Sequence, residues 1–486
     1  MIEKSRAKKR RGLARKWRGM GWRAVEILAA TGGKVLRDGG KTRFGEIVTD
    51  STKVKTGSVF VALKGERHDG HHFVGDAVRR GAGCVIAHRS LPKSALGRAT
   101  AIKVADTLTA LGDLAHYRRQ QFAPKVLAIT GSNGKTTTKE MVAAILQEAW
   151  AGGKRRRGKI LKTEGNFNNL VGLPLTLLRL RKQDKMAVVE LGTNQPGEIQ
   201  RLTEIADPDI GIITSVAAAH LEGLNSLAGV AREKGALYRG MRPNGTIVVN
   251  LDDPWVRKIA ARFPGRKITY GKRGWVRAQA WRMRGMDGMQ LKLKAGQRSC
   301  NVKLNYLGQH NVANALGAAA LTLGVGAKLA AVRRGLAKAR PFSMRMQSED
   351  WRGLSIINDA YNANPASMKA ALQTLAELPC RGRRIAVLGD MFELGKQAAW
   401  EHRQLGKNAA RGAVDFLYLL GDRAALVHRG ALAAGMSPER VIVGKDHTEL
   451  VKRLREQVKK GDCLLFKGSR GMKMEKVLDG LKSGKA

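Results

Sequence analysis

The fold of this chain is decided by the stretch VLAITGSNGKTTTKE at residues 126–140. Its first five residues are aliphatic or β-branched, which predicts a buried strand. The glycines and hydroxyl residues that follow predict a tight turn, and the apolar spacing of residues 141–146 predicts a helix. The order of strand, turn and helix is the local structure that a phosphate-binding loop requires.

Each polar residue of this turn has a physical use in binding phosphate. Gly131 and Gly134 let backbone N–H groups turn inward, Lys135 supplies a positive charge, and Thr136 offers a hydroxyl to Mg²⁺. The usual nucleotide loop has a further glycine where this chain has Ile129, so the motif is the shorter Gly-x-x-Gly-Lys-Thr. We predict a nucleotide-binding loop made of Gly131, Ser132, Asn133, Gly134, Lys135, Thr136 and Thr137.

The bulk composition is that of a globular protein with about three domains. The chain has 486 residues, 43% of them hydrophobic and 26% charged, and a domain takes roughly 100–200 residues. No apolar run approaches the ~18 residues of a membrane span, and the N-terminus lacks the apolar block of a signal peptide. The four cysteines lie far apart, without metal or disulfide spacing. We therefore expect the protein to lie in a reducing cytoplasm.

The net charge is strongly positive. Lys and Arg number 88 against 40 Asp and Glu, which gives +48, with denser runs at residues 4–11 and 154–159. Such a balance raises the hypothesis of a nucleic-acid-binding protein. Neither run is interleaved with aromatic residues, so no stacking platform is evident. A general basic bias together with an anionic substrate is the alternative, and we expect no obligate nucleic-acid partner.

Strand and helix patterns alternate along most of the chain, which predicts an α/β protein with parallel sheets. Residues 268–306 instead show strand-like alternation, which predicts antiparallel strands appended to the central sheet. We predict four segments: a basic disordered extension at 1–20, an α/β domain at 21–122, a central ATP-binding domain at 123–341 and a C-terminal α/β domain at 342–486.

Three side chains in the central segment lie where ligands of a parallel sheet bind, near the ends of strands or soon after them. Glu190 closes a strand and, facing Thr136 across the sheet, could bind Mg²⁺. His220 follows the strand at 211–216, although a lone histidine is more often structural. Lys234 lies in a predicted helix, where an ordinary lysine is solvated. Each of these signals is weak by itself.

Three further polar residues are ambiguous in the same way. Asn311 and Asn314 share a helix face, and helix capping is an equal alternative for them. Asp359 ends a predicted strand and alone would be a capping residue.

Taken together, several motifs resemble the Mur ligases. They are TGSNGKTTTKE at 130–140, EGNFNN at 164–169, ELGT at 190–193, AHLE at 219–222 and DAYNANP at 359–365. The motifs FVALKGER at 60–67, GDMFELG at 389–395 and KGSR at 467–470 favour the members that add a dipeptide. The resemblance covers nearly all of the chain from about Trp22.

The resemblance implies a three-domain fold, with a central P-loop ATPase domain and a C-terminal Rossmann-like domain. It implies an ATP-dependent ligase that adds D-alanyl-D-alanine to UDP-N-acetylmuramoyl-tripeptide through an acyl phosphate, in cytoplasmic synthesis of peptidoglycan precursors. We expect a monomer. A sister ligase adding a single amino acid, and a P-loop ATPase acting on nucleic acid, remain as alternatives.

The resemblance also assigns roles to the ambiguous residues. Thr136 and Glu190 would hold the Mg²⁺ of ATP, and His220 a second Mg²⁺. Lys234 matches a lysine that is carbamylated in this superfamily, and Arg345 matches an arginine that reaches the phosphates when the last domain closes. The implied catalytic groups are Lys135, His220, Lys234 and Arg345.

The remaining implied positions bind ATP or the nucleotide sugar. Asn311 and Asp359 match contacts to the adenine and ribose. The implied substrate residues are Ser51, Lys64, Gly65, Glu66, Arg67, Asn166, Asn168, Asn169 and Lys467. Two positions depart from the family pattern: Thr52 stands where arginine is common, and Gln195 where histidine is frequent. The extension at 1–20 and the basic insertion around 155–157 have no assigned counterpart.

Overall fold

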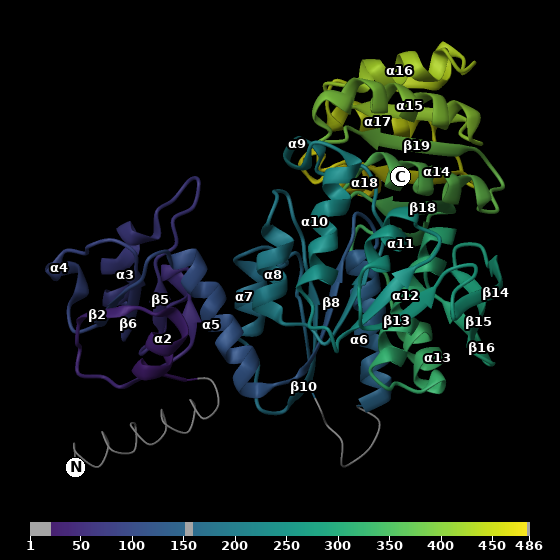
Figure 1. Ribbon diagram of the computed structural model, residues 1–486. Coiled ribbons are helices and arrows are strands. Elements are labelled where there is room, and N and C mark those ends of the chain that lie inside the picture. Colours follow the sequence, from purple (N-terminus) through teal and green to yellow (C-terminus); the bar gives the residue numbers. More distant parts are fainter. Residues whose placement is uncertain (1–20, 151–158, 484–486) are drawn as a thin grey trace, which may run out of the picture. The chain divides into compact units, whose positions relative to one another are not determined.

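Four sheets with helices packed on them make up this chain, which is described by a computed structural model over residues 21–150 and 159–483 (Figure 1). The extension predicted at 1–20 and residues 154–158 of the second basic run lie outside the described residues. The chain divides into two units. One holds the described residues up to Leu127 with 158–191 and 201–208, and the other holds 128–157, 192–200 and 209–486.

The N-terminal part of the first unit is the α/β domain expected there. Its five-stranded sheet has the order β2-β7-β6-β5-β4, parallel except for the β2–β7 pair. The elements are β1 (Trp22–Arg23), α2 (Ala24–Thr31), β2 (Lys34–Arg37), β3 (Arg43–Phe44), β4 (Ile47–Val48), β5 (Val59–Val61), α3 (Val74–Arg79), β6 (Cys84–Ala87), α4 (Lys93–Leu96), β7 (Thr100–Lys103) and α5 (Thr107–Phe122). Trp22 pairs with Phe44 in a two-stranded sheet just before α2.

The largest sheet has nine strands in the order β16-β15-β14-β13-β12-β11-β8-β10-β9. Its elements are β8 (Lys125–Thr130), α6 (Lys135–Trp150), β9 (Lys159–Lys162), α7 (Gly172–Leu177), β10 (Asp184–Glu190), α8 (Glu198–Ala206), β11 (Ile210–Ile213), α9 (Leu221–Leu224), α10 (Leu227–Gly240), β12 (Thr246–Asn250), α11 (Pro254–Ala261), β13 (Arg266–Tyr270), β14 (Val276–Met283), β15 (Met289–Ala295), β16 (Arg298–Leu304), α12 (Gln309–Gly324) and α13 (Leu329–Lys338). The antiparallel strands expected within 268–306 are confirmed as β14 to β16.

The C-terminal sheet has the order β17-β18-β22-β19-β20-β21 and is parallel except for its β17 edge. Its elements are β17 (Gln347–Trp351), β18 (Leu354–Asp359), α14 (Pro365–Glu377), β19 (Arg384–Gly389), α15 (Ala398–Arg411), β20 (Phe416–Leu420), α16 (Ala424–Leu432), β21 (Val441–Val443), α17 (His447–Gln457), β22 (Cys463–Lys467) and α18 (Glu475–Ser483).

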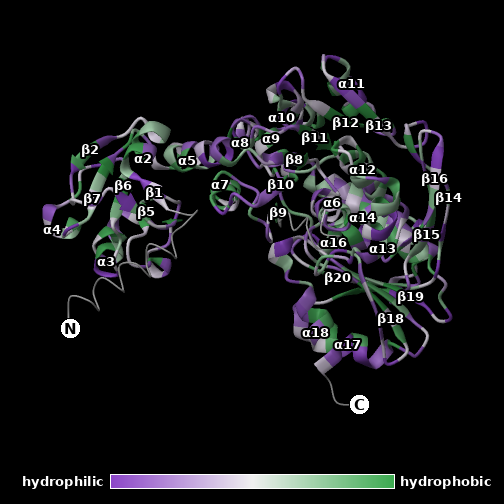
Figure 2. Ribbon diagram, turned by 90° about the horizontal axis from the view of Figure 1, so that it is seen from below, coloured by the Kyte–Doolittle hydropathy of each residue, from purple (hydrophilic) through white to green (hydrophobic). Residues whose placement is uncertain are grey.

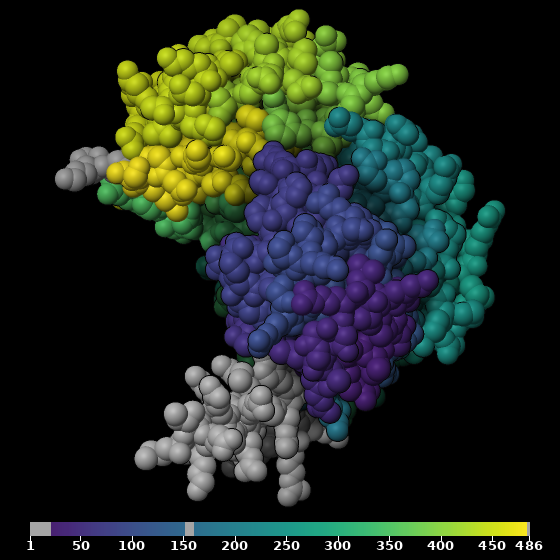
Figure 3. Space-filling model, turned by 90° about the vertical axis from the view of Figure 1, so that its left-hand side faces the viewer, coloured from purple at the N-terminus to yellow at the C-terminus, as the bar shows by residue number. Residues whose placement is uncertain are grey.

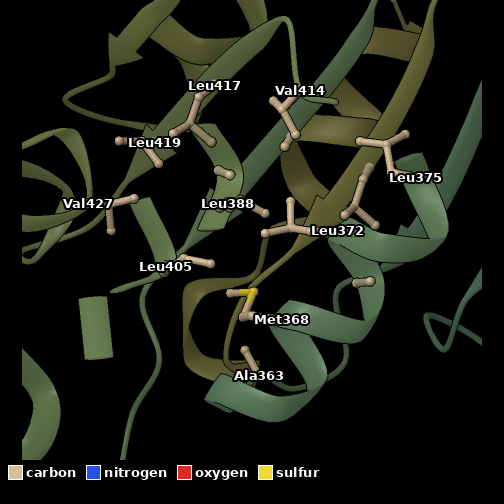
Figure 4. Packing of buried hydrophobic residues seen from close by; sticks show 14 of the residues in the cluster. Ala363, Met368, Leu372, Leu375, Leu388, Leu405, Val414, Leu417, Leu419 and Val427 are labelled. Carbon is tan, nitrogen blue, oxygen red and sulfur yellow. The ribbon is translucent and has the colours of Figure 1, made fainter. Parts of the chain in front are cut away.

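Two apolar layers hold this C-terminal sheet together. On one face, Met368 and Leu372 of α14 pack with Leu388 of β19 and Leu417 of β20 (Figure 4). The other face is covered by α17 and α18, which lie side by side and form the yellow end of the surface in Figure 3. Strands β18 and β19 are correspondingly green, or hydrophobic, in Figure 2. A sheet buried on both faces requires near-continuous apolar strands, as observed here.

The part of the chain that the structure describes holds no helix long and apolar enough to cross a membrane.

Candidate active site

The nucleotide loop predicted from the sequence lies between β8 and α6. Its backbone is fastened to the turn after β11, because the Ser132 N–H donates to the Ser215 carbonyl at 2.8 Å. Thr214 Oγ1 donates to the carbonyl of Asn133 at 2.5 Å, and Ser132 Oγ exchanges two 2.9 Å hydrogen bonds with the backbone of Ala217. The turn after β11 therefore holds the loop in shape. The strand expected at 210–216 ends at residue 213 because residues 214–217 make these contacts.

The two glycines of the loop are required by its geometry. Gly131 has φ 144°, and a Cβ on it would lie 1.9 Å from Thr214 Oγ1. Gly134 has φ 82°, and a Cβ there would lie 2.2 Å from Asn314 Oδ1. Neither position accepts a side chain without displacing a neighbour, so the loop keeps its backbone N–H groups accessible only with glycine.

Lys135 and Thr136 begin helix α6. The Lys135 ammonium donates to the Gly131 carbonyl at 2.7 Å, so it is held over the loop. Thr136 is 2% exposed, and the first turn of a helix favours anions through its N–H groups and dipole. The pair therefore presents a cation and a hydroxyl at one helix N-terminus.

The two asparagines expected on one helix face lie on α12, which packs against α6. Asn314 Nδ2 donates to Asn311 Oδ1 at 2.8 Å, and Asn311 Nδ2 donates to the Leu307 carbonyl at 2.8 Å. Gly308, not an asparagine, caps the helix. Because Asn314 lies against Gly134, this hydrogen-bonded chain connects α12 to the nucleotide loop.

Lys234 differs from the solvated helix lysine that its sequence position would ordinarily suggest. It lies on α10, is 0% exposed, and its Nζ has no hydrogen-bond partner among the described residues. Burial, and then the charge of Lys135, lower the pKa of Lys234 well below its usual value, while Glu233 acts in the opposite sense. The solvated helix lysine weighed from sequence is therefore wrong, and the side chain is a buried amine disposed to be neutral.

Glu233, which sequence reasoning missed, organises the loop before α8. Its carboxylate accepts hydrogen bonds from the backbone N–H groups of Gly197 at 2.8 Å and Ile199 at 2.7 Å. It also accepts one from Thr193 Oγ1 at 3.3 Å. The sequence around Glu233 is typical of a solvated helix and does not indicate this role, because the role depends on the burial of α10.

His220 lies at the start of α9 with φ 54°, an uncommon backbone conformation for a non-glycine residue. Its Nδ1 lies 2.6 Å from a carboxylate oxygen of Glu393, which itself has φ 61°. The hydrogen bond to His220 lowers the pKa of Glu393. Two strained residues from distant parts of the chain thus meet, and the contact leaves His220 Nε2 for another ligand.

A second contact joins the nucleotide loop to the C-terminal region. Asn364 Nδ2 donates to Asn133 Oδ1 at 2.8 Å, and Asn133 Nδ2 donates to Asn364 Oδ1 at 3.4 Å. Asn364 is also the N-cap of α14, where it accepts from the Ser367 N–H at 2.9 Å. Neither Asn364 nor Glu393 was singled out from sequence, although both lie in motifs quoted for the family resemblance.

Arg345 is stacked on an aromatic ring. Its guanidinium carbon lies 3.9 Å from the ring centroid of Tyr361, and its Nε is buried without a hydrogen-bond partner in the described part of the chain. The flanking residues Met344 and Met346 both have positive φ, at 58° and 49°. A strained turn and a cation–π contact therefore fix the guanidinium.

Asp359 and Lys467, expected on the ATP and substrate sides respectively, form an ion pair. Lys467 Nζ lies 2.5 Å from Asp359 Oδ2 and donates to the Asn362 carbonyl at 2.9 Å. The other Asp359 oxygen accepts from the Met346 N–H at 3.0 Å. This pair fixes the end of β18 beside the arginine turn, and a ligand role for either residue stays a prediction.

In the first unit, Glu190 closes β10 as expected and is 2% exposed. One of its oxygens accepts a hydrogen bond from Asn168 Nδ2 at 2.9 Å, so two predicted site residues are in contact. Asn169 Oδ1 accepts a hydrogen bond from the N–H of Gly172, the first residue of α7, at 2.8 Å, and Asn166 is exposed. These positions share one corner of the unit.

The predicted nucleotide-sugar loop of residues 64–67 is exposed and is held at its base by Asp69. The Asp69 carboxylate binds the His71 ring at 2.6 Å and Arg89 at 3.0 Å. Ser51 is buried nearby in chain order, at the start of a short 3₁₀ turn, and Thr52 bonds Asp50 at 2.6 Å. Thr52, which stands where the resemblance places an arginine, thus makes a local turn contact.

Three of the residues that the family resemblance assigns to Mg²⁺ carry side-chain donor atoms. Thr136 and Glu190 are buried oxygen donors, which Mg²⁺ prefers, and His220 keeps one ring nitrogen available. The described residues contain no group of three or more His, Cys, Asp or Glu side chains arranged to hold a metal. The oxygen donors of Thr136 and Glu190 are each of a type that Mg²⁺ accepts, and ligation of Mg²⁺ by Thr136, Glu190 and His220 stays a prediction.

Comparison with known proteins agrees with this geometry. Three domain descriptions match in order: "Mur ligase family, catalytic domain" at residues 43–119, "Mur ligase middle domain" at 129–322, and "Mur ligase, glutamate ligase domain" at 344–470. The UDP-N-acetylmuramoyl-tripeptide–D-alanyl-D-alanine ligase of Escherichia coli is 38% identical over 90% of this chain and 93% of its own length. The enzyme of that name in Bacillus subtilis is 36% identical over 90% and 92%.

Solved structures give the same result. A crystal structure of MurF from Acinetobacter baumannii superposes with a TM-score of 0.88 at 33% identity, covering 96% of this chain and all of the other. The α/β three-domain fold and the resemblance inferred from motifs are thereby confirmed, while the domain boundaries remain predictions. The chain belongs to the Mur ligase family.

Proposed function

We propose that this chain joins D-alanyl-D-alanine to UDP-N-acetylmuramoyl-tripeptide with ATP, in the synthesis of peptidoglycan precursors. The observation that carries the proposal is the formed phosphate loop, in a chain matched over 90% of its length by ligases of that name. The enzyme is placed in the cytoplasm as a monomer.

The chemical difficulty is that two anions must react. The peptide carboxylate attacks the γ-phosphorus of ATP, which gives an acyl phosphate and ADP. The amine of D-alanyl-D-alanine then attacks the acyl carbon, and phosphate leaves. Lys135 lies at the loop and Arg345 is fixed by Tyr361, so the chain provides two cations to offset phosphate charge.

Thr136 and Glu190 are proposed as oxygen ligands of the Mg²⁺ that accompanies ATP, and His220 as a ligand of a second ion. When bound, Mg²⁺ supplies charge neutralisation at the transferring phosphoryl group. Glu393 orients the His220 ring through Nδ1, which directs Nε2 away from it. The proposal for His220 therefore includes Glu393 as the residue that fixes its tautomer.

Lys234 is proposed as a carbamate in the active enzyme. The nitrogen of a neutral buried amine can attack the carbon of CO₂ and lose one N–H proton to a buffer base, which gives a carbamate anion in place of an ammonium. The adjacent Glu233 binds the 193–199 loop, and its charge offsets only part of the effect of burial on Lys234.

Asn311 and Asp359 are proposed on the adenine and ribose side of ATP. Ser51, residues 64–67, Asn166, Asn168, Asn169 and Lys467 are proposed for the nucleotide sugar and peptide. Closure of the C-terminal region over the loop would exclude water from the acyl phosphate. The Asn133–Asn364 and His220–Glu393 contacts support that closure.

The test is incubation of the purified full-length chain with ATP, Mg²⁺, UDP-N-acetylmuramoyl-tripeptide and candidate amines, followed by mass analysis of the product. We expect the mass increase of one D-alanyl-D-alanine, with one phosphate released per product. Ligation of a single amino acid in preference to the dipeptide would assign a sister activity instead. ATP hydrolysis stimulated by DNA or RNA, without a ligation product, would overturn the proposal.

A further inference from the structure

One part of the second unit carries far more positive charge than the rest of the chain. Residues 254–304 contain fourteen Lys and Arg and a single acid, Asp287, so their net charge is +13. At the average density of the chain, +48 over 486 residues, a segment of this length would carry about +5. A uniform basic bias therefore does not account for this segment.

The strand register places part of this charge on one face of the antiparallel strands β14, β15 and β16. Val276, Leu291, Leu293 and Val302 are buried on the inner face, where α12 and α13 contact these strands. The alternate positions point outward. Cross-strand pairing aligns them in three rows: Arg277–Lys294–Ser299, Ala280–Lys292–Asn301 and Arg282–Gln290–Lys303.

The outward face thus holds five cations and no carboxylate. Arg277 lies directly opposite Lys294, an arrangement of like charges that costs free energy in a sheet. Arg282 donates to Gln290 at 3.0 Å, and none of the five cations forms an ion pair with an acid among the described residues. The strands stand at the right-hand edge of Figure 2, away from the nucleotide-loop helix α6. Arg282, Lys292 and Lys303 are exposed, and Arg277 and Lys294 are partly buried.

The arrangement of the charges favours one class of partner. Neighbouring outward positions are spaced about 5 Å across strands and about 7 Å along them, so the cations form a two-dimensional array. The neutral positions in the three rows are Ala, Ser, Asn and Gln, so no aromatic ring interleaves with the cations as in a single-strand nucleic-acid platform. Trp275 is exposed at the tip of the sheet, close in sequence to Lys272 and Arg273. A tryptophan at the rim of a cationic face is a common arrangement at membrane–water interfaces.

We propose that the outward face of β14–β16 binds the surface of an anionic phospholipid bilayer, with Trp275 at the headgroup level. Each cation near such a surface strengthens binding roughly fivefold, because it interacts with the negative surface potential. The five cations and one indole are together enough for reversible peripheral binding. The face is separate from the residues of the ligase site, so binding does not require substrate.

The experiment measures binding of the full-length chain to vesicles of phosphatidylcholine alone or with 30% phosphatidylglycerol, by flotation at physiological salt. The test variant is R277Q/K292Q/K294Q/K303Q. The matched control is K452Q/K459Q/K460Q/K476Q, which removes the same charge from exposed positions of the C-terminal region. Thermal unfolding and ligation with soluble substrates establish that both variants are folded.

We expect the native chain and the control to bind phosphatidylglycerol vesicles and not pure phosphatidylcholine, with the test variant weaker by about 100-fold or more. Substitution W275A would weaken binding further by a few fold. Equal loss in the test and control variants would overturn the proposal, because total charge would then be responsible. A 20-base-pair duplex that binds the native chain more tightly than the vesicles, through the same four residues, would reassign the face to nucleic acid.

Discussion

The Lys234 amine is buried and has no hydrogen-bond partner among the residues that the structure describes, which gives the first prediction at the residue scale. Its pKa in the folded chain is lowered, so between that value and about 10.4 the unfolded state binds a proton that the folded state does not. Stability should therefore rise with pH across this window. In bicarbonate-free buffer we expect Lys234→Met to raise the free energy of unfolding at pH 7 by about 1 kcal/mol or more and to remove that rise.

The same substitution should abolish ligation, and added bicarbonate should stimulate only the native enzyme. The exposed neighbour Arg232 provides the matched control, since Arg232→Met changes charge on the same helix without touching the buried site. Chemical denaturation at several pH values and ligation with and without bicarbonate are the measurements. If Lys234→Met lost stability at pH 7 and kept full ligase activity, the prediction of a neutral Lys234 amine would be wrong.

Lys135 gives the second prediction at this scale. Removing its ammonium withdraws a charge from the nucleotide loop, and Lys135→Ala should lower kcat by about 10³-fold while the fold survives. The control is Lys125→Ala, an exposed lysine at the start of the strand that precedes the loop. Phosphate release and circular dichroism report the two effects. A kcat within tenfold of native would argue against the assignment of the loop.

At the scale of an element, the exposed loop of residues 64–67 depends on Asp69. The backbone N–H of His71 is the main cause that lowers the pKa of Asp69 to about 2. Because this folded value lies below the unfolded value of about 3.9, the stabilisation is complete above pH 4 and is lost as pH falls through about 2.

We expect Asp69→Asn to raise KM for the nucleotide sugar roughly tenfold with kcat near native. Initial-rate kinetics test this prediction, with Asp38→Asn in an exposed turn of the same unit as the control. An unchanged KM in Asp69→Asn would show that Asp69 does not support the substrate loop.

At the scale of the whole molecule, the contact between Asn133 and Asn364 gives a prediction about coupling. Asn364→Asp keeps an N-cap for α14, because aspartate caps as well as asparagine, but it cannot donate to Asn133 Oδ1. We expect kcat/KM for ATP to fall up to about tenfold, with little change in the melting temperature. Asn133→Ala should lower kcat/KM for ATP by a similar factor. The double variant should lose no more kcat/KM than either single variant, which corresponds to a coupling free energy near 1 kcal/mol between the two residues. Additive losses would show that the pair is not coupled.

Much of the site could be predicted from the sequence because its signals are local. The nucleotide loop depends on two glycines, a lysine and a threonine within six residues, and the strand and helix around it follow from apolar spacing. The antiparallel strands in 268–306 were predicted for the same reason. The contacts that sequence reasoning missed, Glu233 with the 193–199 loop and Glu393 with His220, join residues distant along the chain and have no local pattern.

The sequence by itself determined the alternating α/β architecture, the phosphate loop, the family resemblance and the overall positive charge, because each is carried by neighbouring residues or by composition. Only the tertiary structure decided that Lys234 is buried, that Arg345 is stacked on Tyr361, and that the outward cations of β14–β16 form one face. Burial, pairing and strand register depend on which distant segments pack together, and those free energies are set by the whole fold.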